Sequence, residues 1–251
     1  MASQIPKKSE ICIGVDVIPM LRQLKVVGDV SIQPVAEALH EIICSGHYSL
    51  KPRFMLEKST TELHFIPYIK VTNEARNKVM VYQRPAREDG EARLDGNYSV
   101  GIGGHPDSGA LRYDADVLSL EQSLWQSAWS EFKQEIRIEA PCDPKPETDG
   151  WDSIDITDTV IKSIQPIGFI YDPSDDVGLT HVAVLFEVIV PDDALFVANS
   201  PTEVRGAKWL DLIEAKEGPQ RFFENWTRLW IKQSAKEPTR LRDREAFGLG
   251  K

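Results

Sequence analysis

The chain has 251 residues, of which 41% are hydrophobic and 27% charged, and its formal net charge is −10 at pH 7. This composition suits a globular protein with a sizeable core, and the acidic balance argues against a nucleic-acid polymer as partner, because such binding needs a basic surface. A small anionic ligand stays compatible with the acidity, since a divalent cation can bridge acidic side chains to a phosphate.

The sequence carries no pattern typical of membrane insertion or export. Its apolar runs fall short of the roughly 20 residues that cross a bilayer, and the opening MASQIPKKSE lacks the apolar segment of a secretory signal. Cys12, Cys44 and Cys142 are odd in number and have no CxxC spacing. We therefore expect a cytoplasmic protein without disulfides or membrane contact. The oligomeric state stays open, and a homodimer is compatible with the sequence.

The first 58 residues predict a strand and a helix ahead of the main domain. The run EICIGVDVIPML predicts a strand followed by a turn around Pro19. The run SIQPVAEALHEIICSG predicts a helix that Ser31 caps and Gly46 ends. We expect residues 1–58 to form an extension packed on a domain that spans 59–235.

The main domain mixes strands and helices without strict βαβ alternation, which favours an α+β or mixed-sheet α/β fold. LHFIPYIKV and KVMVYQR predict a hairpin, and YSVGIGGHPDSG predicts a short strand that ends at Gly103. LEQSLWQSAWSEFKQEIRI predicts a long amphipathic helix, and RFFENWTRLWIKQ a second one. VIKSIQPIGFIYD and HVAVLFEVIV predict strands, and GAKWLDLIEA a strand leading into a helix. An acidic insertion is expected near 141–158, and a flexible tail at 236–251.

The end of the long helix places two carboxylates where earlier turns place apolar residues. At about 100° per residue, Glu131 and Glu135 fall in the arc that Leu124 and Ala128 occupy before them. Like charges at i,i+4 repel mildly, and the C-terminal end of a helix dipole disfavours acids. A bound cation would offset both effects, since Mg²⁺ is commonly held by one or two carboxylates and substrate phosphates.

The alternative is that the two acids lie in water on the flank of a different core stripe. That stripe would contain four large apolar side chains of the same helix, Trp125, Trp129, Phe132 and Ile136. Acidic pairs on solvated helix faces are common, so geometry alone favours this alternative. In HVAVLFEVIV, period-two alternation likewise places His181 and Glu187 on one face, expected to be exposed, although Glu187 could also supply a ligand or base.

The order of strand, Gly-Gly loop and long helix with an acidic end resembles the Nudix hydrolases. Their signature is G-x5-E-x7-R-E-U-x-E-E-x-G-U, with U a bulky apolar residue, and its core falls on SEFKQE, residues 130–135. Ser130, Gln134 and Arg137 stand where the signature has Arg, Glu and Gly, and an insertion must separate GIGGH from the helix. GEARL, YSVGIGGH, HVAVLFEV and ENWTRL extend the resemblance over most of the chain, toward a bacterial branch of predicted MutT-type phosphoesterases.

The resemblance implies an α/β/α sandwich with a mixed sheet. It also implies a hydrolase that uses Mg²⁺ or Mn²⁺ to cleave a pyrophosphate linkage in a nucleotide-like or other diphosphate substrate. By correspondence, Glu131 and Glu135 would be catalytic metal ligands, and Gln134 and a main-chain carbonyl of Gly104 would complete the metal site.

Three further residues are candidates from their positions in the sequence. His105 follows the Gly-Gly pair and could contact a phosphate or act as general base, or it could be a loop histidine bonded to the backbone. Arg84 and Arg93 flank a charged loop and could bind an anionic ligand, or they could be solvated.

Two other functions keep the same fold. The departures at Ser130 and Gln134 favour a catalytically inactive ligand-binding or regulatory module. Isomerisation of a prenyl diphosphate would need an acid/base pair across the pocket, and the sequence does not identify one.

Overall fold

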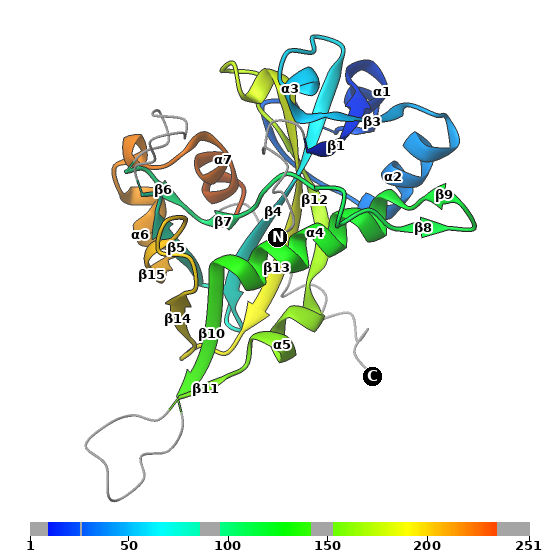
Figure 1. The fold of residues 1–251 in the computed structure, drawn as a ribbon. Coiled ribbons are helices and arrows are strands. Elements are labelled where there is room, and N and C mark those ends of the chain that lie inside the picture. Colours follow the sequence, from blue (N-terminus) through cyan, green and yellow to red (C-terminus); the bar gives the residue numbers. More distant parts are fainter. Residues whose placement is uncertain (1–9, 26, 86–95, 142–152, 235–251) are drawn as a thin grey trace, which may run out of the picture.

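The computed structural model describes residues 10–25, 27–85, 96–141 and 153–234. Helices cover both faces of a mixed β-sheet, so the structure confirms the predicted α/β/α sandwich (Figure 1). Arg93, most of the acidic insertion and the tail at 236–251 lie outside the described residues. In the described part, no helix is long and apolar enough to cross a membrane.

The large sheet has ten strands in the described part of the chain. Its main path is, in spatial order, β15 (Arg205–Asp211), β5 (Lys78–Gln83), β4 (Glu62–Asn73), β13 (His181–Val190), β12 (Gln165–Tyr171) and β2 (Asp29–Ile32). Four shorter strands join this path: β1 (Ile11–Asp16), β3 (Tyr48–Pro52), β6 (Tyr98–Ser99) and β7 (Gly101–Ile102). β4 and β13 run parallel and the other pairs are antiparallel, which makes the sheet mixed.

The helices lie in two layers. In chain order they are α1 (Val17–Gln23), α2 (Val35–Cys44), α3 (Arg53–Leu56), α4 (Leu120–Glu135), α5 (Thr157–Val160), α6 (Leu212–Glu217) and α7 (Asn225–Ser234). α2 and α4 pack on one face of the sheet together with the larger core. α6 and α7 pack on the other face, and α4 runs across β4 and β13 (Figure 1).

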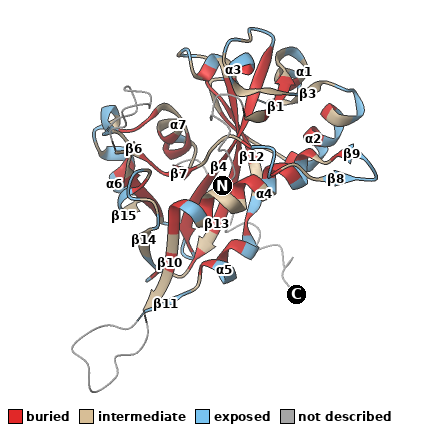
Figure 2. Ribbon diagram, in the orientation of Figure 1, coloured by how far each residue is buried: buried red, intermediate tan, exposed pale blue. Residues whose placement is uncertain are grey.

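Burial on both faces explains why β4 and β13 are the most apolar strands. Alternate residues of β4, such as Phe65 and Ile69, join the core beneath α4, whereas Tyr68 joins the core beneath α7. Every residue of β4 is buried, and the red of Figure 2 concentrates on these two strands and on the inner side of α4. The exposed face predicted for β13 is therefore wrong: His181 and Glu187 share one face as predicted, but both are buried.

Two smaller sheets complete the fold. The first contains β10 (Ile136–Pro141), β11 (Ser153–Asp155) and β14 (Leu195–Ala198). The second is the hairpin of β8 (Tyr113–Asp114) and β9 (Val117–Leu118), which lies in the segment that separates the Gly-Gly loop from α4. Ala115 and Asp116 form its turn, both with positive φ, as a two-residue hairpin turn requires.

Three local predictions are wrong. Pro19 lies in the first turn of α1 and not in a loop, because proline needs no backbone donor there. Ser31 belongs to β2, and Pro34 takes the N-cap position of α2, whereas Gly46 follows the end of α2 with φ of +70° as predicted. α4 stops at Glu135, since Ile136 and the residues after it pair with β14.

Candidate active site at the end of helix α4

The two carboxylates of α4 lie at the edge of its buried stripe. Ala128 and Phe132 are fully buried against the sheet. Glu135 follows on the same side and is only 8% exposed, while Glu131 is half-buried. The end of the helix therefore carries one acid inside the protein and a second acid at its margin.

The alternative core stripe is wrong at its two tryptophans. Trp125 is 36% exposed, and Trp129 is half-buried and only packs against the margin of the core. The two rings stack with their centroids 6.4 Å apart, and the ammonium of Lys133 lies 4.6 Å from the Trp129 centroid. Since the tryptophans occupy the helix surface, burial of Glu135 has no explanation as a solvated flank.

The Gly-Gly loop after β7 lies directly against Glu131. A Cβ atom on Gly104 would come within 2.6 Å of Cδ and Oε1 of Glu131, and one on Gly103 within 2.0 Å of the carbonyl oxygen of Pro67. A side chain on Gly103 would meet the backbone of Pro67, which cannot give way, whereas a side chain on Gly104 would have to displace the carboxylate of Glu131. The two glycines thus allow the loop backbone to approach the carboxylate of Glu131 closely.

Residues that follow β14 cap the C-terminal end of α4. The main-chain carbonyl of Glu135 accepts hydrogen bonds from the amides of Asn199, at 2.9 Å, and Ser200, at 3.3 Å. The side chain of Asn199 donates to the carbonyl of Lys133 at 2.9 Å. These donors satisfy carbonyls that a helix end leaves open, and they hold the last turn in place despite its unfavourable acids.

A buried hydrogen-bond network around Glu224 lies next to α7, on the face of the sheet opposite α4. Arg84 donates from Nε to Glu224 at 2.8 Å. The hydroxyls of Tyr68 and Ser99 donate to the same carboxylate at 2.7 and 2.6 Å. Glu224 is 7% exposed, so this carboxylate is neutralised by Arg84 and solvated by protein hydroxyls rather than by water.

The charge of Glu135 reaches this network. Burial alone would lower the pKa of Arg84, but the carboxylate of Glu224, and in smaller measure that of Glu135, raises it above its ordinary value. Burial raises the pKa of Tyr82, and Glu135 and Glu224 add to that increase. The charge of Glu135 therefore contributes to the electrostatic environment of Arg84 and Tyr82, and for Arg84 it contributes less than Glu224 does.

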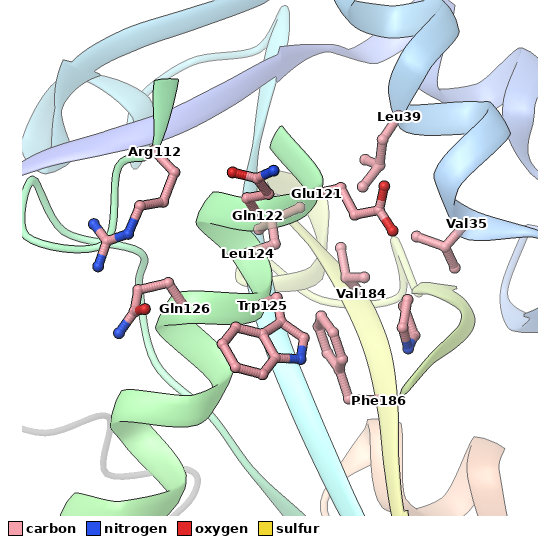
Figure 3. A pocket seen from close by; sticks show the side chains of 11 residues that line it. Val35, Leu39, Arg112, Glu121, Gln122, Leu124, Trp125, Gln126, Val184 and Phe186 are labelled. Atoms are coloured by element: carbon pink, nitrogen blue, oxygen red, sulfur yellow. The ribbon is translucent and has the colours of Figure 1, made fainter. Parts of the chain in front are cut away.

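A sizeable cavity lies away from the two acids. It measures about 480 Å³ and lies between α2, the N-terminal half of α4 and β13, beside Leu39, Trp125 and Phe186 (Figure 3). A smaller cavity of about 90 Å³ is lined by Arg84, Glu224 and their neighbours. We place the chemistry at the acids, because the large cavity has a mainly apolar lining and only scattered polar groups at its rim.

The structure brings together some of the residues predicted for the site and separates others. Glu131, Glu135 and Gly104 lie together, and Arg84 is electrostatically coupled to Glu135. Gln134 is exposed, and its amide donates to Ser130 Oγ at 2.9 Å.

His105 faces two other histidines instead of the two carboxylates. The ring of His105 contacts the rings of His64 and His181. Arg93 lies outside the described residues.

Sequence patterns gave no sign of Glu224, Tyr68 or His64 as site residues. Tyr68 and Glu224 meet although they are 156 positions apart. ENWTRL showed Glu224 only as the start of an amphipathic helix. The available signal was weak: an acid before a helix, and a polar group within an apolar strand.

A divalent cation fits the donors at the end of α4. Carboxylate oxygens and a main-chain carbonyl are the hard ligands that Mg²⁺ and Mn²⁺ prefer. The cradle that a Cβ on Gly104 would fill puts the loop backbone beside Glu131, and Glu135 adds a second carboxylate one turn along.

Comparisons with known proteins agree with this architecture. No family model matches the chain. Protein YmaB of Bacillus subtilis is 27% identical over 154 residues, and the match covers 61% of this chain and 61% of that protein. Tm1382, a provisionally assigned Nudix hydrolase, superposes with a TM-score of 0.61 at 15% identity, over 89% of this chain and 97% of Tm1382. The MutT protein of Methanosarcina mazei Go1 gives a TM-score of 0.35 at 12% identity.

The likeness to Tm1382 extends over nearly all of both chains, although the sequences have diverged widely. The chain therefore has the Nudix fold.

Proposed function

We propose that the protein is a divalent-metal-dependent hydrolase that cleaves a pyrophosphate linkage in a nucleotide-like or other diphosphate substrate. The observation that carries this proposal is the contact between Glu131 and the loop at Gly104, with buried Glu135 one turn farther along α4. A fold hosts many activities, so the proposal depends on this site and not on the likeness to other proteins.

The two carboxylates and the carbonyl of Gly104 form the proposed ligand set. Mg²⁺ or Mn²⁺, when bound there, would polarise the phosphoryl oxygens and lower the pKa of the attacking water. Gln134 is left out of this set because its side chain is exposed and bonded to Ser130. With only two charged ligands, the protein is expected to need a higher metal concentration than a site with three.

The cavity at Arg84 supports the proposal that the substrate binds together with a cation. Besides Arg84, its lining includes the acids Asp172, Asp175 and Glu224. A free phosphate would be repelled by this lining, whereas a metal-bound diphosphate would bring its own compensating charge. Arg84, held in place by Glu224, would orient the anionic end of the substrate.

A second candidate is a binding or regulatory module without turnover. It is favoured by the hydrogen bond between Gln134 and Ser130, which occupies two positions where the Nudix signature has charged residues. A screen of diphosphate compounds with Mg²⁺ and with Mn²⁺ separates the two candidates. Metal-dependent cleavage of the diphosphate into two monophosphate products supports the hydrolase, whereas a thermal shift without any product supports the module.

Gly104→Ala tests the ligand geometry. The added Cβ must displace the carboxylate of Glu131, so we expect apparent metal affinity to fall by about ten-fold or more. Stability should change little, because only the far end of a flexible side chain has to move. A metal titration of diphosphate cleavage measures the effect. Gly109→Ala, which adds a methyl group elsewhere in the same loop, is the matched control.

If Gly104→Ala had the same metal affinity and melting temperature as the parent protein, the position of Glu131 against the loop would not matter for metal binding. The ligand set would then have to be revised.

A further inference from the structure

Three histidines from distant parts of the chain meet on one side of the large sheet. His64 belongs to β4, His181 begins β13, and His105 follows the Gly-Gly loop. His64 and His181 are direct neighbours across the parallel pair of strands. One ring nitrogen of each histidine lies within 4.8 Å of the others, and Nε2 of His105 is 3.1 Å from Nε2 of His181.

His64 is the most unusual member of this group. It is fully buried, and neither of its ring nitrogens has a hydrogen-bond partner among the residues that the structure describes. A neutral imidazole carries at least one N–H donor and one acceptor, and burying both without partners costs their full desolvation. Packing would be better served by an apolar side chain at this position.

The surroundings of His181 favour one tautomer of its ring. Its Nδ1 lies 2.8 Å from the carbonyl oxygen of Val177, which can only accept a hydrogen bond, and 2.9 Å from Oγ1 of Thr180, which can donate or accept one. With the proton on Nδ1, as the Val177 carbonyl favours, Nε2 presents its lone pair toward His105. A backbone carbonyl that fixes the tautomer in this way is the usual outer partner of a metal-bound histidine.

We propose that His64, His105 and His181 bind a transition-metal ion, with zinc as the first candidate. Imidazole nitrogens suit Zn²⁺, and a site with three protein ligands leaves a fourth position for water or another ligand. Tetrahedral coordination at about 2.0–2.1 Å separates two ligand nitrogens by roughly 3.3 Å. The His105–His181 pair already has nearly this separation, and closing the site requires a shift of at most about 1.5 Å at the most distant nitrogen.

This site differs from the carboxylate site of the proposed function in both donors and place. Nitrogen ligands select a transition metal, whereas the carboxylates of α4 select Mg²⁺ or Mn²⁺. The two are linked through the chain, because His105 directly follows Gly104. A metal on the three histidines would tie β4, β13 and the Gly-Gly loop together, and so hold Gly104 against Glu131.

Ring packing is the competing explanation. The rings of His64 and His181 stack, with centroids 4.7 Å apart and planes at 21°, and the ring of His105 meets that of His64 edge-on. Stacking accounts for contact between the rings, but it leaves both nitrogens of His64 without a partner in the described structure.

The test is the metal content of the full chain, reconstituted with zinc, dialysed and measured by elemental analysis. We expect about one zinc per chain, and less than about a tenth of that in His105→Ala. Chelation with 1,10-phenanthroline should lower the melting temperature of the parent protein by roughly 5–10 °C and leave that of His105→Ala unchanged. Cobalt in place of zinc should give the visible absorption of a tetrahedral nitrogen site.

His40→Ala is the matched control. His40 is exposed, and its Nε2 lies 3.4 Å from Cys44 Sγ, so this pair on α2 could hold stray zinc. Zinc that disappears in His40→Ala but persists in His105→Ala would overturn the proposal, as would a chain that retains no zinc, cobalt, nickel or copper. Neither metal content nor melting temperature depends on hydrolysis. Failure of this proposal is therefore distinguishable from failure of the proposed function.

Discussion

Replacing Glu135 by Gln is expected to lower metal-dependent turnover of a diphosphate substrate by about 10²-fold or more. Glutamine has the shape of glutamate and can still offer a carbonyl oxygen, but it removes one of the two negative charges proposed to hold the cation. Glu135 is also the more buried of the two acids, so water has little room to take over as a ligand. Turnover at saturating Mg²⁺ and Mn²⁺ is the measurement.

The same substitution is expected to leave the fold almost unchanged. It weakens the attraction between Glu135 and Arg84, which destabilises the folded chain. It also removes the repulsion with Glu131 and an acid from the negative end of the helix dipole, which stabilises it. Because these effects oppose one another, we expect the free energy of unfolding to change by no more than about 1 kcal/mol.

Glu121→Gln provides the matched control on the same helix. Glu121 is an exposed acid in the first turn of α4, far along the helix from the Gly-Gly loop. The Glu121→Gln variant undergoes the same chemical change and should keep the turnover of the parent protein. Equal turnover in Glu135→Gln, Glu121→Gln and the parent protein would remove Glu135 from the active site.

The periodicity of the sequence predicted those helices and strands whose hydrophobic pattern follows directly from the burial of one or both of their faces. β4 and β13 are continuous apolar runs because both faces of the sheet are covered, and α2 and α7 carry one apolar face each. The end of α4 was predicted wrongly because the strand that ends the helix, β14, lies far away in the sequence. Ile136 continues the helical spacing of Trp129 and Phe132, yet it pairs with β14, about sixty residues later.

The candidate site was predictable only in part, for a similar reason. Glu131 and Glu135 were visible as acids that interrupt an apolar stripe, and the resemblance connected them with Gly104. The Arg84–Glu224 pair and the three histidines arise from strand pairing and helix packing between segments far apart in the chain. No local sequence pattern indicates such long-range contacts, and a histidine or tyrosine within an apolar strand has the appearance of an ordinary core residue.

Disrupting the buried ion pair between Lys70 and Glu187 is expected to lower the stability of the protein strongly. The two groups are 2.8 Å apart, with side chains only 6% and 10% exposed, and Lys70 also lies 4.3 Å from the ring centroid of Trp230. Glu187→Leu leaves the ammonium of Lys70 buried without its carboxylate. We expect the free energy of unfolding in urea to fall by about 3–5 kcal/mol.

The double variant Lys70→Met/Glu187→Leu separates the cost of an unpaired charge from the value of the pair. With both charges removed, most of the lost stability should return, since well-packed apolar residues often replace a buried ion pair at little cost. Arg76, which also bonds Glu187 at 2.9 Å, is partly exposed and can remain solvated in either variant. The double variant should therefore be clearly more stable than Glu187→Leu.

The pair also predicts how stability depends on pH. Burial alone would raise the pKa of Glu187, but Lys70 and then Arg76 lower it below its ordinary value. A carboxyl group whose pKa is lower in the folded state stabilises the protein above its unfolded pKa of about 4.3. That contribution is lost as the pH falls through the lower folded pKa. Stability of the parent protein should thus fall more steeply below about pH 4.3 than stability of the double variant.

A surface ion pair of similar length shows what burial adds. Lys133 and Asp158 are 2.7 Å apart, but their side chains are 37% and 74% exposed, so Asp158→Asn should cost less than about 1 kcal/mol. The contrast follows from desolvation: water solvates Lys133 when its partner is removed, whereas β13 and α7 keep water from Lys70. If Glu187→Leu cost no more than Asp158→Asn, Lys70 would have to reach solvent in the variant, and the two helical layers would not seal the sheet as the structure shows.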